Sequence, residues 1–359
     1  MDLVAIARDA LRAGASDIHL KVGQPPLLRV DGEIRPLAGF AEVTQVELAR
    51  SLWDIMNPAQ QEKFKATNEC DLATNFAEVA RFRVNVFRQQ GKIGAVLRAI
   101  PTQIRTIDEL KLPRVLKSMA AARHGLVLVT GATGCGKSTT LSAMLEEINR
   151  TTSSHILTIE DPVEFLFTDR KSVVNQREVG LDAVNFHNAL RAALRQDPDV
   201  ILIGELRDLE TVEIALAAAE TGHLVMGTLH TVGAHETINR IMGFYEPHHH
   251  AQIRLLLGSL LRGVVSQRLV PGASGGRVAA LEVMVNTGTI YECIVDANRT
   301  REIRDHIRKG RANYQTQTFD QHLHELVKEG RVREADALKY ATNPDELALR
   351  LSGMAADDD

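Results

Sequence analysis

Residues 126–140 read LVLVTGATGCGKSTT, and this stretch decides the fold of the larger part of the chain. The run LVLVT at 126–130 is apolar and β-branched, which predicts a buried strand. The run GATGCGKS at 131–138 matches the pattern G-x-x-x-x-G-K-[ST], and a helix-forming segment follows to about Arg150. A strand, a glycine-rich loop and a helix in this order predict a phosphate-binding loop in an α/β domain.

The residue types of this loop suit a bound nucleoside triphosphate. Glycines let the backbone approach a phosphate closely, and the helix N-terminus adds a favourable partial positive charge. Lys137 can reach the β- and γ-phosphates, and the Ser138 hydroxyl can ligate Mg²⁺. The alternative is a glycine-rich turn without a ligand, which the flanking strand and helix disfavour. The predicted nucleotide-binding residues are Gly131, Ala132, Thr133, Gly134, Cys135, Gly136, Lys137, Ser138 and Thr139.

Composition and charge limit the function classes. The 359 residues allow two domains, and a net charge of −4 with 4% aromatic residues argues against nucleic acid as a partner. Cys70, Cys135 and Cys293 form no CxxC pair, which fits a reducing compartment. No apolar run approaches the roughly 20 residues of a spanning helix. Charged residues interrupt the apolar start of the chain, so we expect a cytoplasmic protein without a signal peptide or direct membrane insertion.

The sequence changes character near residue 105. Before it, helices are predicted at 2–13 and 44–66, and strands at 17–22, 27–30, 34–37, 71–76, 81–90 and 93–100, as in a small α+β domain. After it, strands and helices alternate at 126–130, 137–149, 155–159, 185–195, 200–203, 208–221 and 223–229, which predicts a mostly parallel sheet with helices on both faces. We expect an N-terminal domain at 1–103, a linker at 104–113, an ATPase core at 114–286 and a C-terminal helical region with an acidic tail at 287–359.

A second site element is the run DPDVILIGE at 197–205. Its four consecutive large aliphatic residues predict a central buried strand, and Glu205 follows the end of that strand. In doubly wound folds a carboxylate at this position lies beside the phosphate loop, where it can hold Mg²⁺ through water or orient the attacking water. The alternative is a strand that simply ends in a solvated glutamate.

Two further runs, TIEDPVE at 158–164 and TGHLVMGTLH at 221–230, add acidic and imidazole groups. The carboxylates of Glu160, Asp161 and Glu164 suit water activation or Mg²⁺ handling, although charge runs are usually solvated. His230 ends a predicted buried strand and could contact a γ-phosphate. A histidine satisfied by a backbone carbonyl is the common alternative for both His223 and His230.

Together these elements resemble the secretion ATPase superfamily, and within it the PilT-like type IV pilus retraction ATPases. The similar motifs are GASDIHL at 14–20, ARFRVNVF at 80–87, TIEDPVEF at 158–165, NQREV at 175–179, LRQDPDVILIGELRD at 194–208 and AETGHLVMGTLHT at 219–231. The resemblance extends over nearly the whole chain. It implies an N-terminal PAS-like α+β domain, a RecA-like P-loop NTPase domain with C-terminal helices, and a homohexamer that binds nucleotide between subunits.

The resemblance also implies roles for matching residues, with ATP and Mg²⁺ as cofactors. The roles of phosphate and Mg²⁺ contact fall to Lys137, Ser138 and the Walker B residue Glu205, water activation to Glu164, and γ-phosphate contact to His223 and His230. Which glutamate is the general base stays open, and we favour Glu164. The candidates for arginines donated across a subunit boundary are Arg81, Arg83 and Arg98, whose alternation on a strand also fits a solvated face.

The function implied is a hexameric ATPase that powers type IV pilus retraction and twitching motility at the inner face of the cell membrane. Its implied partners are an inner-membrane pilus platform protein and a paralogous pilus ATPase.

Two departures from the family pattern qualify this expectation. Ala132 and Cys135 stand where the family usually has Pro and Ser. Because Cys135 precedes a helix N-terminus and a lysine, we hypothesise a lowered thiol pKa and inhibition by thiol reagents. The run TIYECIVD at 289–296 replaces the A-I-R-N-L-I-R-E of retraction members. A PilU-like accessory ATPase and a pilus-assembly or type II secretion ATPase therefore remain alternatives.

Other function classes fit the sequence less well. The acidic charge balance opposes a RecA-like nucleic-acid motor, and a GTP switch would need an Asn-Lys-x-Asp motif, which does not occur. A small-molecule kinase has no use for the large first domain, and the acidic and histidine motifs oppose a non-hydrolysing regulator. Three adjacent histidines at 248–250 cannot all face one metal ion from a helix, so we predict a solvated loop or helix start there.

Overall fold

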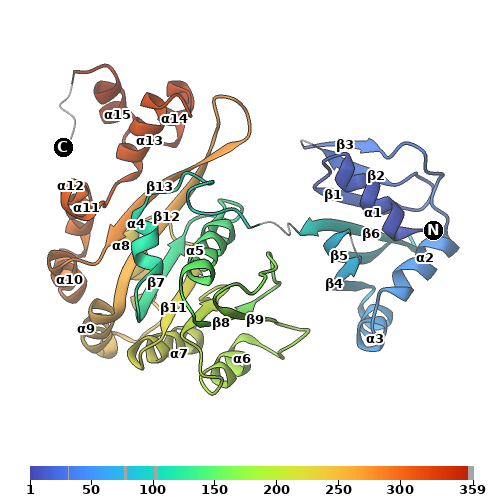
Figure 1. Ribbon diagram of the computed structural model, residues 1–359, viewed down its shortest axis with the longest axis horizontal. Coiled ribbons are helices and arrows are strands. Elements are labelled where there is room, and N and C mark those ends of the chain that lie inside the picture. The colour runs from blue at the N-terminus through green and yellow to red at the C-terminus, as the bar shows by residue number, and fades with distance from the viewer. Residues whose placement is uncertain (31, 77–78, 101–103, 355–359) are drawn as a thin grey trace. The chain divides into compact units, whose positions relative to one another are not determined.

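The computed structural model describes residues 1–30, 32–76, 79–100 and 104–354 (Figure 1). The chain divides into two compact units. The first comprises Met1–Gln103 together with Glu164–Leu166, and the second comprises Ile104–Val163 together with Phe167–Asp359.

The first unit is an antiparallel sheet with helices against one face. Its sheet has the strand order β3-β2-β1-β6-β5-β4. The helices are α1 (Leu3–Arg12), α2 (Gln45–Asp54) and α3 (Pro58–Thr67), and the strands are β1 (Asp17–Lys21), β2 (Leu27–Val30), β3 (Glu33–Pro36), β4 (Glu69–Phe76), β5 (Ala80–Gln89) and β6 (Lys92–Ile100). In β5, Phe82, Val84 and Val86 alternate into the core that the helices cover, so the residues between them belong to the opposite face.

The second unit contains a seven-stranded sheet of order β13-β12-β7-β11-β10-β8-β9. Its strands are β7 (Gly125–Thr130), β8 (His155–Glu160), β9 (Val173–Glu178), β10 (Val200–Ile203), β11 (Leu224–Leu229), β12 (Leu261–Pro271) and β13 (Arg277–Val285). All neighbouring strands are parallel except β12 and β13, which form an antiparallel hairpin.

Helices cover both faces of this sheet. The helices of the second unit are α4 (Val115–Ala120), α5 (Lys137–Thr151), α6 (Phe186–Ala193), α7 (Leu209–Glu220), α8 (Ala234–Met242), η1 (Pro247–His249), α9 (His250–Leu260), α10 (Gly288–Val295), η2 (Ala297–Glu302), α11 (Ile303–Lys309), α12 (Arg311–Tyr314), α13 (Phe319–Lys328), α14 (Glu334–Tyr340) and α15 (Pro344–Leu351). Two separate apolar cores, one with α4 and α5 and one with α6 to α11, place helices on opposite faces. The predicted mostly parallel sheet with helices on both faces is confirmed.

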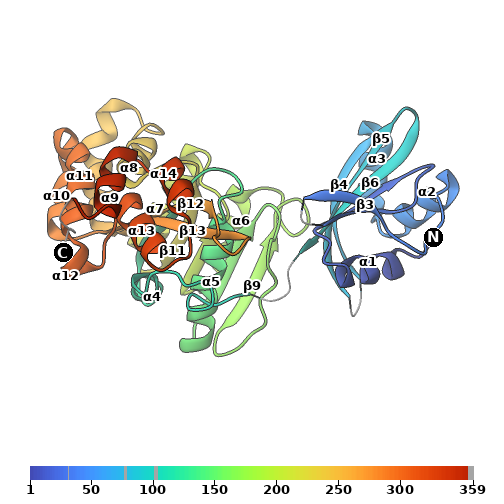
Figure 2. The same cartoon turned by 90° about the horizontal axis from the view of Figure 1, so that it is seen from above.

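Helices α13 and α14 lie beside β13 and β12 (Figures 1 and 2), and their apolar residues form a small core with Val270 and Ala280 of that hairpin. The sequence reading did not predict strands at 261–285, and it therefore missed the hairpin that receives these helices. Among the helices of the described ranges, none combines the length and the apolar character needed to cross a bilayer.

Candidate functional site

The phosphate-loop sequence forms a tight loop between β7 and α5, at the carboxyl ends of the parallel strands. Gly131 and Gly136 adopt φ values of 141° and 91°, in the left-handed region that favours glycine. A Cβ at Gly131 would lie 2.4 Å from the Gln267 carbonyl oxygen, and one at Gly136 would lie 2.7 Å from Gln267 Nε2. The positive φ therefore favours glycine at both positions, and at Gly131 the Gln267 backbone carbonyl also leaves no space for a Cβ.

Lys137 is buried at the first position of α5. Its Nζ donates to the carbonyl oxygens of Gly131 at 2.8 Å and Ala132 at 3.2 Å. Within the described part of the chain, no carboxylate lies in ion-pair contact with Lys137, so the direct partners of its ammonium are backbone carbonyls. The N-cap residue Gly136 offers no capping side chain, which leaves the N–H groups of this helix start available to an anion. Ser138 and Thr139 are half-buried in the same turn.

Gln267 lies on β12, the strand next to β7, and holds the phosphate loop in place. Its Nε2 donates to the Cys135 carbonyl at 2.7 Å, and its Oε1 accepts from Thr140 Oγ1 at 2.6 Å. The side chain is only 3% exposed, so both bonds lie in a low-dielectric interior. The sequence reading missed this residue, because Gln267 lies more than a hundred positions from the loop and belongs to the hairpin that was not predicted.

The structure brings Glu205 and His230 together at the same edge of the sheet. Glu205 follows β10, and His230 follows the adjacent strand β11. His230 Nε2 lies 3.2 Å from Glu205 Oε1, and His230 Nδ1 lies 3.5 Å from Thr133 Oγ1 in the phosphate loop. An imidazole with its proton on Nε2 donates to the carboxylate, and its Nδ1 then faces the Thr133 hydroxyl at the outer limit of hydrogen-bond distance.

Arg207 contacts the other carboxylate oxygen, with its NH2 atom 2.7 Å from Glu205 Oε2. Glu205 is thus held between an imidazole and a guanidinium, which keep its carboxylate in one orientation. In the sequence, Arg207 stands out only as part of the motif at 194–208, and no role was predicted for it.

The acidic run after β8 places its carboxylates differently. Glu160 is the last residue of β8 and is buried; its Oε1 accepts from Thr158 Oγ1 at 2.7 Å and from Gln176 Nε2 at 3.3 Å. Gly204 donates its N–H to the Ile159 carbonyl at 2.8 Å, so Glu160 ends the strand next to the one that Glu205 follows. Glu164 is exposed in the loop after β8 and groups with the first unit, so its predicted role as general base stays a prediction.

His223 lies at the opposite edge of the sheet from the phosphate loop of its own chain. It precedes β11, and its carbonyl accepts the N–H of Gly125 at the start of β7. The six residues of β7 separate this edge from the loop by roughly 20 Å at about 3.3 Å per residue. Its Nδ1 donates to the Ala218 carbonyl at 2.9 Å, which is the backbone-satisfied alternative. Contact between His223 and a γ-phosphate on the same chain is therefore wrong.

The three candidate arginines belong to the first unit. Arg83 and Arg98 are directly paired across β5 and β6, on the face opposite the helices, and Arg81 lies on β5 two residues before Arg83. Arg98 Nε lies 2.7 Å from Asp17 Oδ1. Burial alone would raise the pKa of Asp17, but hydrogen bonds from Arg98 and Ser16 outweigh it and lower the pKa below its ordinary value. Arg98 thus has a structural partner, and arginine donation across subunits stays a prediction.

The expected lowering of the Cys135 thiol pKa is wrong, while inhibition by thiol reagents stays a prediction. Cys135 is 7% exposed, and burial raises the pKa of its thiol more than the nearby Lys137 lowers it. The lysine and the helix N-terminus are visible in the sequence, whereas the burial of the Cys135 side chain follows only from the fold. The histidines at 248–250 form the short helix η1 and the start of α9, as predicted, and His248 pairs with Glu246 at 3.4 Å.

Comparison with protein families matches residues 1–353 to the family described as "Type II/IV secretion system protein". The chain is 44% identical to the "Type IV pilus retractation ATPase PilT" of Pseudomonas aeruginosa over 97% of this chain and 100% of that protein. It is 38% identical to the "Type IV pilus ATPase PilU" of the same organism, over 100% of this chain and 94% of the relative.

A solved structure gives the same result in three dimensions. The crystal structure of the pilus retraction motor PilT with bound ADP superposes with a TM-score of 0.91. It shares 43% sequence identity and covers 97% of this chain and 99% of the solved one.

Proposed function

The chain belongs to the type II/IV secretion system protein family, and we propose that it is a homohexameric ATPase motor that powers type IV pilus retraction. It is an ATPase of the PilT-like group, to which it is similar along nearly its whole length. The observation that carries the site assignment is the constellation of phosphate loop, His230 and Glu205 at one edge of the sheet.

ATP binding follows from the groups around the loop. The Lys137 ammonium exchanges its two carbonyl partners for phosphate oxygens, which carry the negative charge that the carbonyls lack. The uncapped N-terminus of α5 adds N–H donors toward the same phosphates. The loop's conformation is already set by Gln267, so little ordering remains for the bound state.

Ser138 and Glu205 are the residues that would hold Mg²⁺. Hydroxyl and carboxylate oxygens are the hard donors that this ion takes. Ser138 lies in the first turn of α5 and Glu205 follows β10, both at the edge of the sheet that carries the phosphate loop. When bound, the ion supplies charge neutralisation for the phosphoryl group that is transferred.

His230 connects the phosphate loop to Glu205, which suits it to report on the γ-phosphate. A change at Thr133 on nucleotide binding alters what His230 Nδ1 accepts, and the ring carries that change to the carboxylate at Nε2. We propose that Glu164 activates the attacking water and that arginines among Arg81, Arg83 and Arg98 reach the phosphates of a neighbouring subunit. His223 is left for contacts outside its own chain's site.

The test of the site is ATP hydrolysis by purified variants. Lys137→Ala and Glu205→Ala should each abolish turnover, because the first removes the phosphate-binding ammonium and the second the carboxylate of the constellation. Far-UV circular dichroism on the same samples checks that the fold is kept. Full hydrolysis in either folded variant refutes the assignment.

The second candidate function is an accessory or assembly ATPase. It is supported by the run TIYECIVD at 289–296, which departs from the pattern of retraction members. The run covers α10 from its second residue to its end and the C-cap residue Asp296, where retraction members carry a different pattern. The similarity to a PilU protein over the whole chain points the same way. Retraction and accessory roles give different phenotypes on gene deletion.

The remaining proposals concern place and partners. We propose that the protein works in the cytoplasm at the inner face of the cell membrane, on an inner-membrane pilus platform protein and with a paralogous pilus ATPase. We also keep the division of the chain into four parts at 1–103, 104–113, 114–286 and 287–359.

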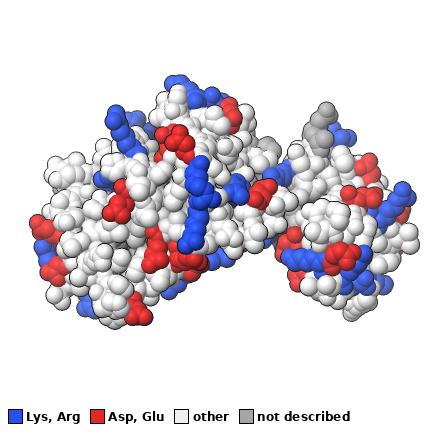
Figure 3. All heavy atoms as spheres, turned by 90° about the horizontal axis from the view of Figure 1, so that it is seen from below, with Lys and Arg blue, Asp and Glu red and all other residues white. Residues whose placement is uncertain are grey.

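The surface charge does not favour a nucleic-acid motor. Basic and acidic side chains are interspersed on the face in Figure 3, and such a mixed surface attracts a phosphate backbone only weakly. ATPase stimulation by DNA or RNA would contradict the pilus assignment.

A further inference from the structure

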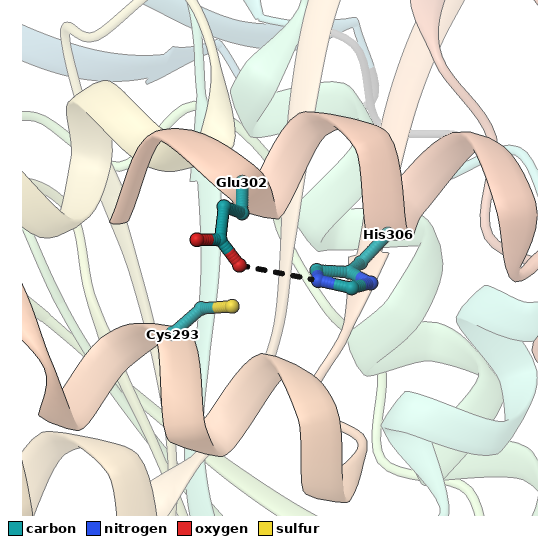
Figure 4. A group of neighbouring side chains, drawn as sticks. All are labelled: Cys293, Glu302 and His306. Atoms are coloured by element: carbon teal, nitrogen blue, oxygen red, sulfur yellow. Dashed lines mark ion pairs between the residues drawn. The ribbon is translucent and has the colours of Figure 1, made fainter. Parts of the chain in front are cut away.

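Three side chains of metal-binding type converge in the C-terminal helices. Cys293 comes from α10, Glu302 ends η2, and His306 belongs to α11 (Figure 4). Their sulfur, carboxylate oxygen and imidazole nitrogen all lie within 4.8 Å of one another. Figure 4 shows the three side chains pointing toward a common point between the two helical segments.

The backbone fixes these segments relative to each other. Thr300 Oγ1 donates to the Cys293 carbonyl at 3.3 Å, and the buried Arg254 donates from NH1 to the Ile294 carbonyl at 2.8 Å and to Thr300 Oγ1 at 3.0 Å. Asp296 caps η2 by accepting the Asn298 N–H at 2.9 Å. The three donors are therefore presented by a braced turn.

The distance between Glu302 and His306 leaves room for a bridging ion. Glu302 Oε2 lies 3.8 Å from His306 Nε2, which is longer than the roughly 2.7–3.2 Å of a hydrogen bond. With zinc–ligand distances of about 2.0–2.1 Å for O and N and about 2.3 Å for S, tetrahedral geometry separates O from N by about 3.3 Å and S from either by about 3.5 Å. The observed pair needs to close by about 0.5 Å, which side-chain rotation supplies.

The local charge also favours a cation. Burial raises the pKa of the Cys293 thiol, and the charged groups acting on it are one guanidinium, that of Arg299, and three carboxylates, those of Glu292, Asp296 and Glu302, so the incoming metal ion has to displace the thiol proton. Arg299 donates to Glu292 at 2.9 Å and to Glu302 at 3.1 Å. Its charge is already matched by these two carboxylates, and its bond to Glu302 orients that side chain, as outer partners of metal ligands do.

We propose that Cys293, Glu302 and His306 bind one Zn²⁺-class divalent ion. Thiolate and imidazole donors select zinc and cobalt over Mg²⁺ and Ca²⁺. On binding, the Cys293 S–H bond breaks, its proton goes to the solvent, and a sulfur–metal bond forms, while the neutral His306 ring gives its lone pair. Water takes the fourth position. Because Glu302 is exposed and Cys293 is buried, the ion enters from the Glu302 side.

The site would join α10 to α11 across the turn. Cys293 lies inside the run TIYECIVD, where this chain departs from the pattern of retraction members. The metal site is thus a property expected of this chain and independent of its proposed function in retraction.

The experiment uses the full chain, stripped of metal with a chelator and titrated with Co²⁺. The wild type should bind one equivalent and show tetrahedral cobalt bands in the visible range together with a thiolate-to-cobalt charge-transfer band. Both signals should disappear in Cys293→Ala and weaken at least tenfold in apparent affinity in His306→Ala. Cys70→Ala is the matched control, since Cys70 is also a buried free cysteine and its loss should leave the titration unchanged.

Thermal unfolding gives an independent readout. Zn²⁺ should raise the midpoint of the wild type and of Cys70→Ala but not that of Cys293→Ala. If Cys293→Ala does not fold, the exposed ligand variant Glu302→Gln replaces it. A wild-type titration without a charge-transfer band, or a band that persists in a folded Cys293→Ala or in Glu302→Gln with unchanged affinity, overturns the proposal.

Discussion

Replacing Gln267 with leucine tests whether this residue sets the shape of the phosphate loop. Leucine has nearly the same volume but neither hydrogen-bonding atom. The substitution leaves the Cys135 carbonyl and the Thr140 hydroxyl without the partners that now lie at 2.7 Å and 2.6 Å. Both groups belong to the loop or the first turn of α5, so the loss acts directly on the phosphate-binding segment.

The expected magnitude follows from the cost of an unsatisfied buried group. Each such group costs roughly 1–3 kcal/mol. The Thr140 hydroxyl can turn to a carbonyl of the preceding helical turn, which reduces its share. A total of about 2–4 kcal/mol remains, and the loop relieves it by leaving its present conformation. If about 2 kcal/mol is lost from the binding-competent loop, nucleotide affinity falls roughly 30-fold.

The assay is a titration of the purified protein with fluorescent ADP, with thermal unfolding measured on the same samples. Gln317→Leu is the matched control, because Gln317 is also a buried glutamine that donates to a backbone carbonyl, at 3.1 Å, but to Leu281 rather than to the loop. Both variants should lose stability, and only Gln267→Leu should lose nucleotide affinity. Equal nucleotide affinity in Gln267→Leu and wild type refutes the reasoning.

Three other outcomes are expected. Glu282→Gln should raise the unfolding midpoint at pH 8 and change it little at pH 5. Burial raises the pKa of Glu282 to about 7 from 4.5, so the folded chain keeps a proton that the unfolded chain releases. The associated stability is complete below pH 4.5 and is lost as the pH rises through 7, on the order of 3 kcal/mol. A midpoint difference between Glu282→Gln and wild type that is larger at pH 5 than at pH 8 contradicts this. Iodoacetamide should alkylate Cys135 more slowly than free cysteine at pH 7.5, because burial raises the pKa of its thiol, and mass spectrometry of timed samples decides. Faster alkylation than free cysteine would restore the reactive-thiol hypothesis. Specific ATPase activity should rise steeply with protein concentration until the ring assembles, since an arginine from a neighbour is worth about 10³–10⁵ in rate; flat specific activity over that range excludes such an arginine.

The alternating part of the fold was predictable because its signals are local. The aliphatic runs at 126–130 and 200–203 could only be buried strands in a covered parallel sheet, and they are β7 and β10. The hairpin of β12 and β13 was missed because its pairing is long-range: β12 joins the sheet beside β7, far away in sequence. Nothing in its local pattern distinguishes an added strand pair from other apolar segments.

The same distinction between local and long-range signals applies to the site residues. Glu205 and His230 follow neighbouring parallel strands and therefore meet at one edge of the sheet, as expected, while their roles stay predictions. His223 was misplaced, because it precedes its strand and so lies at the other edge. The burial of Cys135 and the bracing by Gln267 depend on packing between distant segments, which no motif records.

The central claim, that this chain is a pilus retraction motor, is tested most directly by deleting its gene and measuring both surface pili and twitching. The account predicts cells with excess pili that do not twitch, restored by the wild-type gene but not by Lys137→Ala. Cells without pili would mean an assembly role, and cells that twitch normally with normal pili would contradict the claim.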